Sequence, residues 1–395
     1  MTSSFIHVAP IKQTVGELSL ESIKETAALL ASRGGPDVPG CVSSIEDFQI
    51  TGPEVIRLTS QAFAATNGTI VMSSGGTTGT PKLTFVPYEQ SIGRIAQAWQ
   101  PLSSENVMLN LYNPGRLWGS HYYMLALTQH LRCRIVPMGA LSPDEVETYL
   151  PVIKAAGVDT LAGTPTAVHD FALGMRQCGA NLPLKKVMWV GEPWNLKKKA
   201  EVEDIFPGVT FWGNYGSIET YVIGSNTATC PHDIFHLHPD QLLELDDDGA
   251  LLTRAGEGWT VPTLRYRLGD TLKSVECPCA KPHAFQVKGR SDSGFKFGGT
   301  LFNSIELLAY LRMIEGVDEV QLEISGSKGQ AIATDVAVNF VGSASPQTIL
   351  ARLMREFVDI DVRDSNGKLR LMARSVKVLE RNSRIHKIPA VIWPS

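Results

Sequence analysis

Residues 71–82 read VMSSGGTTGTPK, and they are the stretch from which the rest of the chain is best interpreted. The apolar residues 69–72 predict a strand that opens into a loop of Ser, Thr and Gly closed by Pro-Lys. Small side chains, φ-permissive glycines and many backbone N–H groups suit a loop that folds around phosphate oxygens. A Walker A loop is excluded, because Thr80-Pro81 stands where that motif requires Gly before its Lys. A flexible surface linker is the plain alternative.

This run resembles the phosphate-binding loop of the acyl- and aryl-adenylating enzymes, whose pattern is Ser/Thr-Ser-Gly-Ser/Thr-Thr-Gly-x-Pro-Lys. One position departs from the pattern, because Gly75 stands where the family has Ser. The resemblance implies that the loop holds the β- and γ-phosphates of ATP and that Thr78 also takes part in catalysis. The residues that it assigns to the nucleotide are Ser73, Ser74, Gly76, Thr77, Thr78, Gly79, Thr80 and Lys82.

The composition is that of a chain able to bury a large core. Its 395 residues are 43% hydrophobic and 19% charged, and the net charge is −4 without a long basic run. This length predicts two or three domains, and the charge argues against nucleic-acid binding. No apolar leader segment and no 18-residue apolar stretch occur, so we predict a soluble, cytoplasmic protein that binds no membrane. Six Cys are too few for a disulfide scaffold.

The order of apolar segments predicts an α/β fold. Residues 13–33 and 54–65 have helical spacing, and residues 90–215 alternate between strand-like and helical segments. Such alternation is typical of a parallel sheet with helices on both faces, whose ligands bind beyond the carboxyl ends of the strands. Residues 225–290 have the shorter alternation of antiparallel strands, and residues 292–395 predict a small α+β domain.

Two predicted strand ends carry residues suited to a nucleotide. Residues 186–190 end at Gly-Glu-Pro and residues 209–212 end at GNYGSIE. A glycine lets a flat ring approach the backbone, a Tyr can stack on it, and a Glu can hold Mg²⁺ beside phosphates. Alone, each is an ordinary turn. Together they resemble the Gly-Glu-Pro and Tyr-Gly-x-Ser/Thr-Glu segments of the adenylating enzymes, although Ile218 replaces the Ser/Thr. In the resemblance, the Gly-Glu-Pro segment lies along adenine, Tyr215 stacks on it, and Glu219 meets Mg²⁺. The residues that it assigns to the nucleotide here are Gly191, Glu192, Pro193, Asn214, Tyr215, Gly216 and Ser217.

Cys and His residues between positions 230 and 283 have the residue types of a tetrahedral zinc site. Reduced thiols placed by chance are the alternative. A site closed by four protein ligands would be structural, because a catalytic zinc keeps one position open. The Cys-Pro-Cys-x-x-x-His segment resembles that of the phenylacetate–CoA ligase-like branch of the family. We predict the ligands Cys230, His236, Cys277 and Cys279, with His232 or His283 as the substitute histidine.

Later motifs match the same family in the same order. Asp270, after Gly in a turn, resembles the Asp that holds the ribose hydroxyls, and Arg290 opens a segment like the family's Gly-Arg-x-Asp hinge. The hinge implies an N-terminal adenylate-forming domain over residues 1–291, with nucleotide, acyl and zinc sites, and a mobile C-terminal domain over residues 292–395. Lys387 falls on the family's catalytic lysine, although the preceding Gly is replaced by His.

The resemblance implies ATP-dependent activation of a carboxylic acid to an acyl-AMP, with release of pyrophosphate and transfer to CoA. A flat aromatic acid would suit the aromatic residues near two strand ends, although such residues more often belong to the core. The alternatives are transfer to an amine, a carrier protein or a reductase in a phenazine-type antibiotic pathway, and a non-catalytic nucleotide-binding protein. The changes at Gly75, Ile218, Ser293 and His386 favour the last. The sequence is also compatible with a homodimer. The aromatic residues are Trp118, Tyr122, Tyr123 and Trp212.

Overall fold

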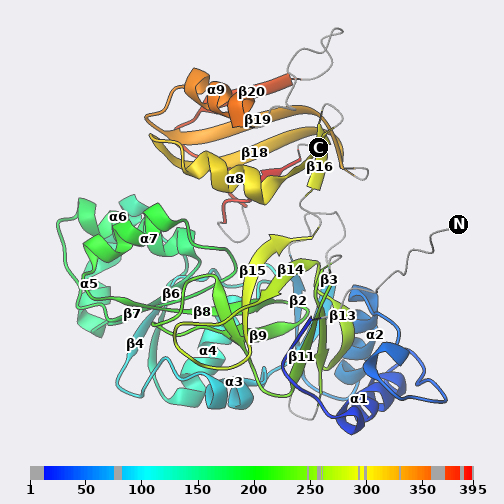
Figure 1. Cartoon of the computed structure of the whole chain (residues 1–395). Coiled ribbons are helices and arrows are strands. Elements are labelled where there is room, and N and C mark those ends of the chain that lie inside the picture. The colour runs from blue at the N-terminus through cyan, green and yellow to red at the C-terminus, as the bar shows by residue number, and fades with distance from the viewer. Residues whose placement is uncertain are drawn as a thin grey trace, which may run out of the picture. The chain divides into compact units, whose positions relative to one another are not determined.

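The computed structural model describes residues 13–74, 82–246, 249–255, 259, 261–291, 294–297, 300–328, 331–356, 370–382 and 387–393. The chain divides into two compact units. Figure 1 labels their helices and strands and colours them by residue number. The first unit comprises Met1–Gln100 and Gly213–Lys288, and the second comprises Pro101–Trp212 and Gly289–Ser395. Each unit therefore combines two separate stretches of sequence. The domain division predicted at residue 292 stays a prediction.

The first unit contains a four-stranded antiparallel sheet with the order β1-β11-β12-β13. Helix α1 (Leu20–Ser32) buries Ile23, Ala27 and Leu30 against this sheet. The helix predicted over residues 13–33 was therefore wrong at its start, because the first three residues pair with β11 instead. The strands are β1 (Gln13–Val15), β11 (Gln241–Leu245), β12 (Leu251–Arg254) and β13 (Thr263–Arg267).

The Gly-rich run connects two paired strands. Strands β2 (Thr69–Ser74) and β3 (Lys82–Pro87) form an antiparallel hairpin in which Ser74 pairs with Lys82. The pairing brings the two ends of the run side by side, and residues 75–81 themselves lie outside the described residues. The sequence predicted β2 but not β3.

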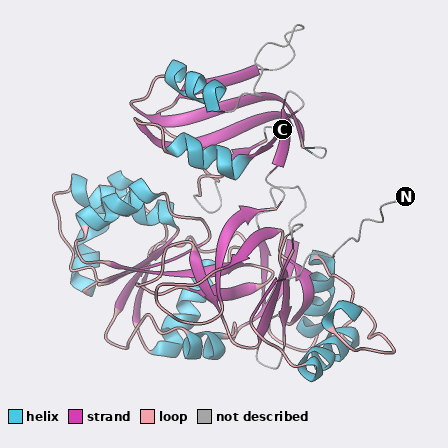
Figure 2. Ribbon diagram, in the orientation of Figure 1, coloured by secondary structure: helices cyan, strands magenta, loops and turns pink. Residues whose placement is uncertain are grey.

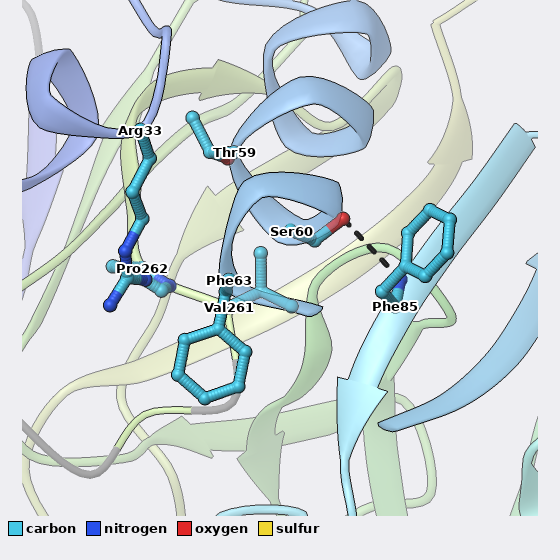
Figure 3. Close-up of a pocket in the computed structure, with 7 residues that line it drawn as sticks. All are labelled: Arg33, Thr59, Ser60, Phe63, Phe85, Val261 and Pro262. Carbon is cyan, nitrogen blue, oxygen red and sulfur yellow. Dashed lines mark hydrogen bonds between the residues drawn. The ribbon is translucent and has the colours of Figure 1, made fainter. Parts of the chain in front are cut away.

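Helix α2 (Pro53–Ala64) packs against strand β3 of this hairpin. The sequence predicted this helix over residues 54–65. The Phe85 N–H donates to the Ser60 hydroxyl over 3.3 Å (Figure 3). The cavity beside this contact has a volume of about 10 Å³ and is too small for a nucleotide. Its lining residues are Arg33, Thr59, Ser60, Phe63, Phe85, Val261 and Pro262.

A second group of strands in the first unit has the order β14-β15-β10-β9-β8. Neighbours from β15 to β8 pair antiparallel. The pairing of β10 with β15 confirms the antiparallel strands predicted within residues 225–290, whereas β8 was predicted as part of the parallel sheet. The rings of Phe235 and Phe285 stack with centroids 6.1 Å apart in its core. Helix α3 (Ile92–Ala98) precedes Trp99, whose indole N–H donates to the Asn226 carbonyl over 2.8 Å. The strands are β8 (Thr210–Ser217), β9 (Tyr221–Ser225), β10 (Ile234–Leu237), β14 (Asp270–Ser274) and β15 (Ala284–Arg290).

The second unit contains the predicted parallel strands, in the order β7-β6-β4-β5. Strands β4 and β6 are buried along their whole length, as is usual for parallel strands covered on both faces. Helix α4 packs on β5, and α6 packs on β6, β7, α5 and α7. The strands are β4 (Val107–Asn110), β5 (Arg134–Pro137), β6 (Thr160–Gly163) and β7 (Lys186–Val190). The helices are α4 (Ser120–Leu131), α5 (Val146–Ala156), α6 (Pro165–Gln177) and α7 (Leu196–Ile205).

The end of the chain forms a sheet of its own (Figure 2). Its order is β17-β16-β19-β18-β21, and β20 also pairs with β19. Helices α8 (Ser304–Arg312) and α9 (Pro346–Glu356) pack against it around a core that includes Leu311, Val338 and Phe340. The strands are β16 (Gly294–Phe297), β17 (Thr300–Asn303), β18 (Val317–Ser327), β19 (Ile332–Gly342), β20 (Arg370–Ser375) and β21 (Val391–Ile392).

Short 3₁₀ turns, η1 (Ile45–Asp47) and η2 (Pro143–Glu145), complete the described elements. In the part of the chain that the structure describes, every helix is too short or too polar to cross a membrane.

Candidate functional site

The predicted adenine and ribose residues of the first unit lie together. The Tyr215 hydroxyl donates to Asp270 Oδ2 over 2.6 Å, although the two residues are 55 positions apart. The Tyr215 ring is held by Phe235 and Phe285, with centroid distances of 5.8 and 5.5 Å. Gly269 adopts φ +73°, which turns the chain so that Asp270 begins β14. An aromatic face and a carboxylate are thus held together by packing.

Glu219 lies in the tight turn between β8 and β9 and is buried, with 8% of its surface exposed. The turn is closed by Ser217 and Thr220, whose hydroxyl oxygens lie 2.9 Å apart. A Cβ on Gly216 would lie 1.8 Å from the Tyr221 carbonyl oxygen, so this turn requires glycine. Strand β8 runs through the Tyr-Gly-Ser segment and leads into a hairpin, and the strand expected over residues 209–212 was therefore too short.

The loop residues predicted to bind phosphate are only partly described. Ser73 is fully buried in β2, and Ser74 and Lys82 form the last strand pair before the loop. The other residues of that prediction lie outside the described residues: Gly76, Thr77, Thr78, Gly79 and Thr80. Their assignment to phosphate remains a prediction.

In the second unit, Gly191, Glu192 and Pro193 follow the carboxyl end of β7 as predicted. The Thr166 N–H, in the first turn of α6, donates to Glu192 Oε1 over 2.7 Å. Gly191 has φ +104°, a conformation that favours glycine.

Lys387 meets this strand end. Its Nζ donates to the Gly191 carbonyl oxygen and lies 5.3 Å from the centre of the Trp118 ring. A Cβ on Gly191 would come within 3.1 Å of Lys387 Cε and Nζ, so glycine leaves the space that the lysine occupies. The structure therefore brings together Lys387, Gly191 and Trp118, three residues that the sequence had placed at one site.

The other predicted aromatic residues are spread over separate surroundings. Tyr123 is buried in α4, and Tyr122 is half-buried with its ring 5.7 Å from that of His121. The Trp212 indole N–H donates to the Thr210 hydroxyl over 3.1 Å within β8. Arg290 is exposed at the end of β15, and Asn214 is buried in β8. Their predicted contacts with the acid or the nucleotide remain predictions.

The sequence missed a buried polar network beside Trp118 and Tyr123. The Tyr112 hydroxyl donates to the Gly163 carbonyl over 2.8 Å, and its burial raises its pKa well above the ordinary value. His121 Nδ1 lies 2.6 Å from the Tyr112 carbonyl oxygen, so it carries the proton. Nothing in the spacing of Tyr112 and His121 signals this contact, because both read as core residues of a strand and a helix.

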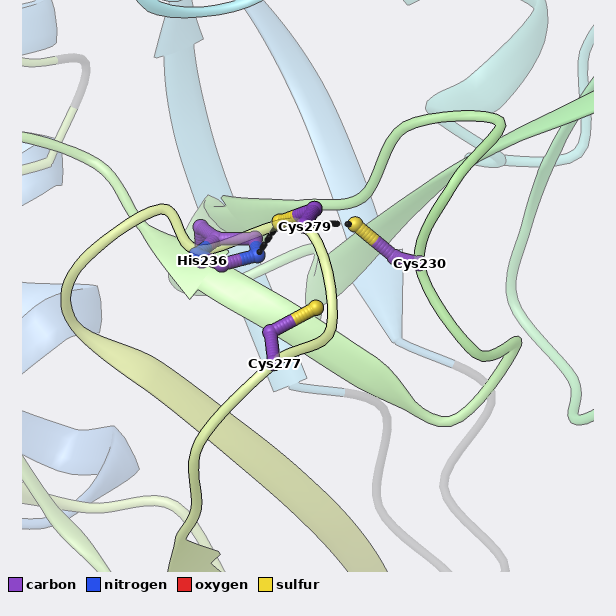
Figure 4. A group of neighbouring side chains, drawn as sticks. All are labelled: Cys230, His236, Cys277 and Cys279. Atoms are coloured by element: carbon purple, nitrogen blue, oxygen red, sulfur yellow. Dashed lines mark hydrogen bonds between the residues drawn. The ribbon is translucent and has the colours of Figure 1, made fainter.

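The predicted metal ligands converge within the first unit (Figure 4). The ligand atoms of Cys230, His236, Cys277 and Cys279 all lie within 4.8 Å of one another. The Sγ atoms of Cys230 and Cys279 are 3.7 Å apart, and Cys279 Sγ is 3.1 Å from His236 Nε2. Two sulfurs that share a tetrahedral zinc with bonds of about 2.3 Å are separated by about 3.8 Å. The donor set and spacing therefore fit zinc.

The neighbours of the cluster also favour a metal. His236 Nδ1 lies 2.9 Å from the Pro282 carbonyl oxygen, which can only accept, so this nitrogen carries the proton. Nε2 is then left as an electron-pair donor that faces the three sulfurs, the arrangement usual for a metal-bound histidine. Of the two substitute histidines, neither His232 nor His283 belongs to the group of four among the residues searched.

The fold and the sequence together place the protein in a family. A sequence model of the AMP-binding enzymes matches residues 12–282, and the chain belongs to that family. The indoleacetate–lysine synthetase of Pseudomonas savastanoi is 24% identical over 252 residues, which are 61% of this chain and 63% of that enzyme. The match thus spans less than two thirds of that relative.

Solved structures confirm the predicted α/β adenylate-forming fold. A 2-hydroxyisobutyryl-CoA ligase in complex with 2-HIB-AMP superposes with a TM-score of 0.67 at 16% identity, covering 95% of this chain and 88% of that one. An anthranilate CoA ligase in complex with anthranoyl-AMP gives 0.56 at 15% identity, covering 80% and 65%.

Proposed function

We propose that the protein activates a carboxylic acid with ATP to give an acyl-AMP and pyrophosphate. The observation that carries this proposal is the position of Lys387, whose ammonium group lies against the carboxyl end of β7. Membership of the AMP-binding enzymes supports the choice of nucleotide.

In the proposed reaction, a carboxylate oxygen of the acid attacks the α-phosphorus of ATP. The new P–O bond forms as the bond to the pyrophosphate oxygen breaks, and pyrophosphate leaves with the electron pair. No proton is transferred, so the protein contributes orientation and stabilisation of negative charge. Lys387 would place its positive charge between the carboxylate and the α-phosphate. Mg²⁺ held by Glu219 would neutralise charge on the phosphates, which the Gly-rich loop would cradle.

The nucleotide contacts follow from the first unit. Tyr215 would stack on adenine, and Asp270, already hydrogen-bonded to it over 2.6 Å, would accept from the ribose hydroxyls. Because both side chains are oriented by packing before ATP arrives, little ordering is left for binding to supply.

For the acid, we propose an aromatic carboxylate. Trp118 is buried and lies beside Lys387, so an acid whose carboxylate meets the lysine would place its ring near an aromatic side chain. Indoleacetate and anthranilate, the acids in the names of two similar proteins, are both aromatic.

CoA is the proposed acceptor of the acyl group, which would place the protein in the phenylacetate–CoA ligase-like branch. The second candidate is an amine. The indoleacetate–lysine synthetase is named for an acid and the amino acid lysine. This similarity favours an amine as the acceptor in this chain. Release of AMP that requires CoA would support the first, and release that requires an added amine would support the second.

We further propose that Cys230, His236, Cys277 and Cys279 bind one structural Zn²⁺. Four protein ligands fill a tetrahedral site, so the metal would join the β9–β10 and β14–β15 connections without meeting a substrate. Metal analysis of the purified protein, with release of zinc by a thiol-reactive mercurial, tests the stoichiometry of one.

The main test is acid-dependent exchange of radiolabelled pyrophosphate into ATP, with a panel of aromatic, heteroaromatic and aliphatic acids. We expect exchange with aromatic acids that is lost in Lys387→Ala. Absence of exchange with every acid, while ATP still binds, would favour the non-catalytic nucleotide-binding alternative.

A further inference from the structure

Lys387 lies in the last part of the chain, and its position depends on contacts far from it in sequence. The Asn382 N–H donates to the Lys387 carbonyl oxygen over 2.8 Å, so these two residues lie side by side. On β18, the buried Gln321 side chain donates to the carbonyl oxygens of Glu380 and Pro389 over 3.0 and 2.8 Å. Hydrogen bonds therefore hold the chain on both sides of Lys387. The position of the lysine side chain depends on the contacts that hold β18 and Arg381 in place.

The first anchor is Asp170 on α6. Both of its carboxylate oxygens accept from the guanidinium of Arg381, one of them from Nη2 over 3.2 Å. Only 10% of the Asp170 side chain is exposed, so salt screens this pair weakly. The pairing with Asp170 raises the pKa of Arg381. Arg381 directly precedes Asn382, whose N–H donates to the Lys387 carbonyl, so the Asp170–Arg381 pair holds the chain next to that contact.

The second anchor is Glu319 near the start of β18, two residues before Gln321. Lys198 Nζ of α7 lies 2.8 Å from its Oε2, and Arg312 Nε donates to its Oε1 over 3.1 Å. Asn195, the N-cap of α7, donates to the Glu319 carboxylate over 3.1 Å and to the Asp318 carbonyl over 3.0 Å.

Both anchors involve the helices that flank Gly191, because Asp170 belongs to α6 and Glu319 pairs with Lys198 of α7. Strand β7 ends at Val190, and α7 begins at Leu196, so Asn195 follows Gly191 by four residues. Helix α6 presents Asp170 one turn after Thr166, whose N–H donates to Glu192. The helices that hold the lysine segment are thus directly connected to the turn at Gly191, whose carbonyl oxygen accepts from Lys387.

We propose that Asp170 and Glu319 are positioning residues, which hold Lys387 at the Gly191 carbonyl and so set the rate of acyl-adenylate formation. This inference rests on the proposed function. Neither carboxylate touches Lys387, so each acts through the segment it anchors. A displacement of a charged group by about 1 Å can cost about 100-fold in rate, which is enough for a remote anchor to matter.

The test compares Asp170→Asn and Glu319→Gln with Asp204→Asn, in wild-type and Lys387→Ala backgrounds. Asp204 on α7 pairs with Arg176 on α6 over 3.0 Å at the surface, so its variant removes a similar charge from the same two helices. We expect each anchor variant to lower the rate of pyrophosphate exchange about 10- to 100-fold, with the KM for ATP changed less than about twofold. Asp204→Asn should leave both unchanged.

The Lys387→Ala background separates positioning from general damage. An anchor that acts through Lys387 has no further effect once the lysine is absent, whereas a merely structural role would lower the residual rate again. An equal loss in both backgrounds, or no loss in the wild-type background, overturns the proposal. If an anchor variant melts early, Arg381→Lys keeps the charge but loses the paired geometry and should show the same dependence on Lys387.

The proposed function and this inference fail differently. No exchange by the wild-type protein with any acid overturns both. Exchange by the wild type that is lost in Lys387→Ala and unchanged in the anchor variants overturns only the positioning role.

Discussion

The Cys/His cluster of the first unit and the Lys387 contact of the second unit show two ways of holding reactive side chains. The cluster draws its four ligands from residues 230–279, and its ligand atoms face one another within 4.8 Å. Lys387 meets a carbonyl 196 positions away and is held by ion pairs at a distance from its own charge. Under the proposed roles, the cluster only stabilises the fold and can close on itself, whereas Lys387 meets a substrate and must leave its charge accessible.

The largest effect should come from Lys387→Ala. Loss of a charge aimed at the transition state should lower acyl-adenylate formation by about 100- to 1,000-fold. Because Lys387 is half-buried, the free energy of unfolding should change by less than about 1 kcal/mol. Pyrophosphate exchange and urea unfolding measure the two effects, with Lys185→Ala, a surface lysine paired with Asp159, as the control. A destabilised variant with near-normal exchange would make Lys387 structural, like the cluster.

Removal of a cluster ligand should lower the stability of the fold and leave the binding of the acid unchanged, the reverse of the effect of Lys387→Ala. In Cys277→Ser, zinc should be lost and the free energy of unfolding should fall by about 3 kcal/mol, because metal binding is coupled to folding. The KM for the acid should stay the same in the protein that remains folded. His283→Ala is the matched control, because this exposed histidine lies outside the group of four. The His283→Ala protein should retain the metal. Loss of zinc in His283→Ala alone would show that the ligand set is wrong.

Acid should weaken the second unit through Glu319. Burial alone would raise the pKa of this carboxyl, but Lys198 and Arg312 lower it to about 2, against an ordinary value of 4.5. A carboxyl whose pKa is lower in the folded state stabilises above the unfolded pKa, and the gain is lost as pH falls from about 4.5 towards 2. We expect a loss of about 2 kcal/mol over this range. Glu319→Gln should remove that part of the pH dependence of unfolding, and an unchanged profile would contradict it.

The smallest effect should come from Trp118. Its ring lies 5.3 Å from Lys387 Nζ, and such a cation–π contact contributes about 1 kcal/mol, or roughly fivefold in rate. Trp118→Leu should therefore slow exchange about fivefold, and Trp118→Phe should slow it less. If Trp118 acts on the lysine, the loss disappears in Lys387→Ala. A loss that persists there, with a raised KM for the acid, would make Trp118 part of the acid pocket instead.

Much of the secondary structure and the residues of the Cys/His cluster could be predicted from residue type and short-range spacing. Helices α2 to α7 and the parallel strands follow from apolar periodicity, and the four cluster residues follow from the few residue types that bind zinc. The errors occur where distant segments compete with local preference. Residues 13–15 pair with β11 and leave the predicted helix, and β3 forms because its partner β2 lies across the Gly-rich run.

The sequence by itself determined the α/β class and the family motifs, and it predicted the roles of Lys387 and of the cluster ligands, because these depend on residue type and on short spacing. Only the tertiary structure decided that Trp118 lies beside the lysine, that the four cluster ligand atoms face one another, and that Asp170 pairs with Arg381 and Glu319 with Lys198. An ion pair between positions 211 residues apart leaves no periodic trace in the chain. It depends on which surfaces meet when the sheets and helices pack.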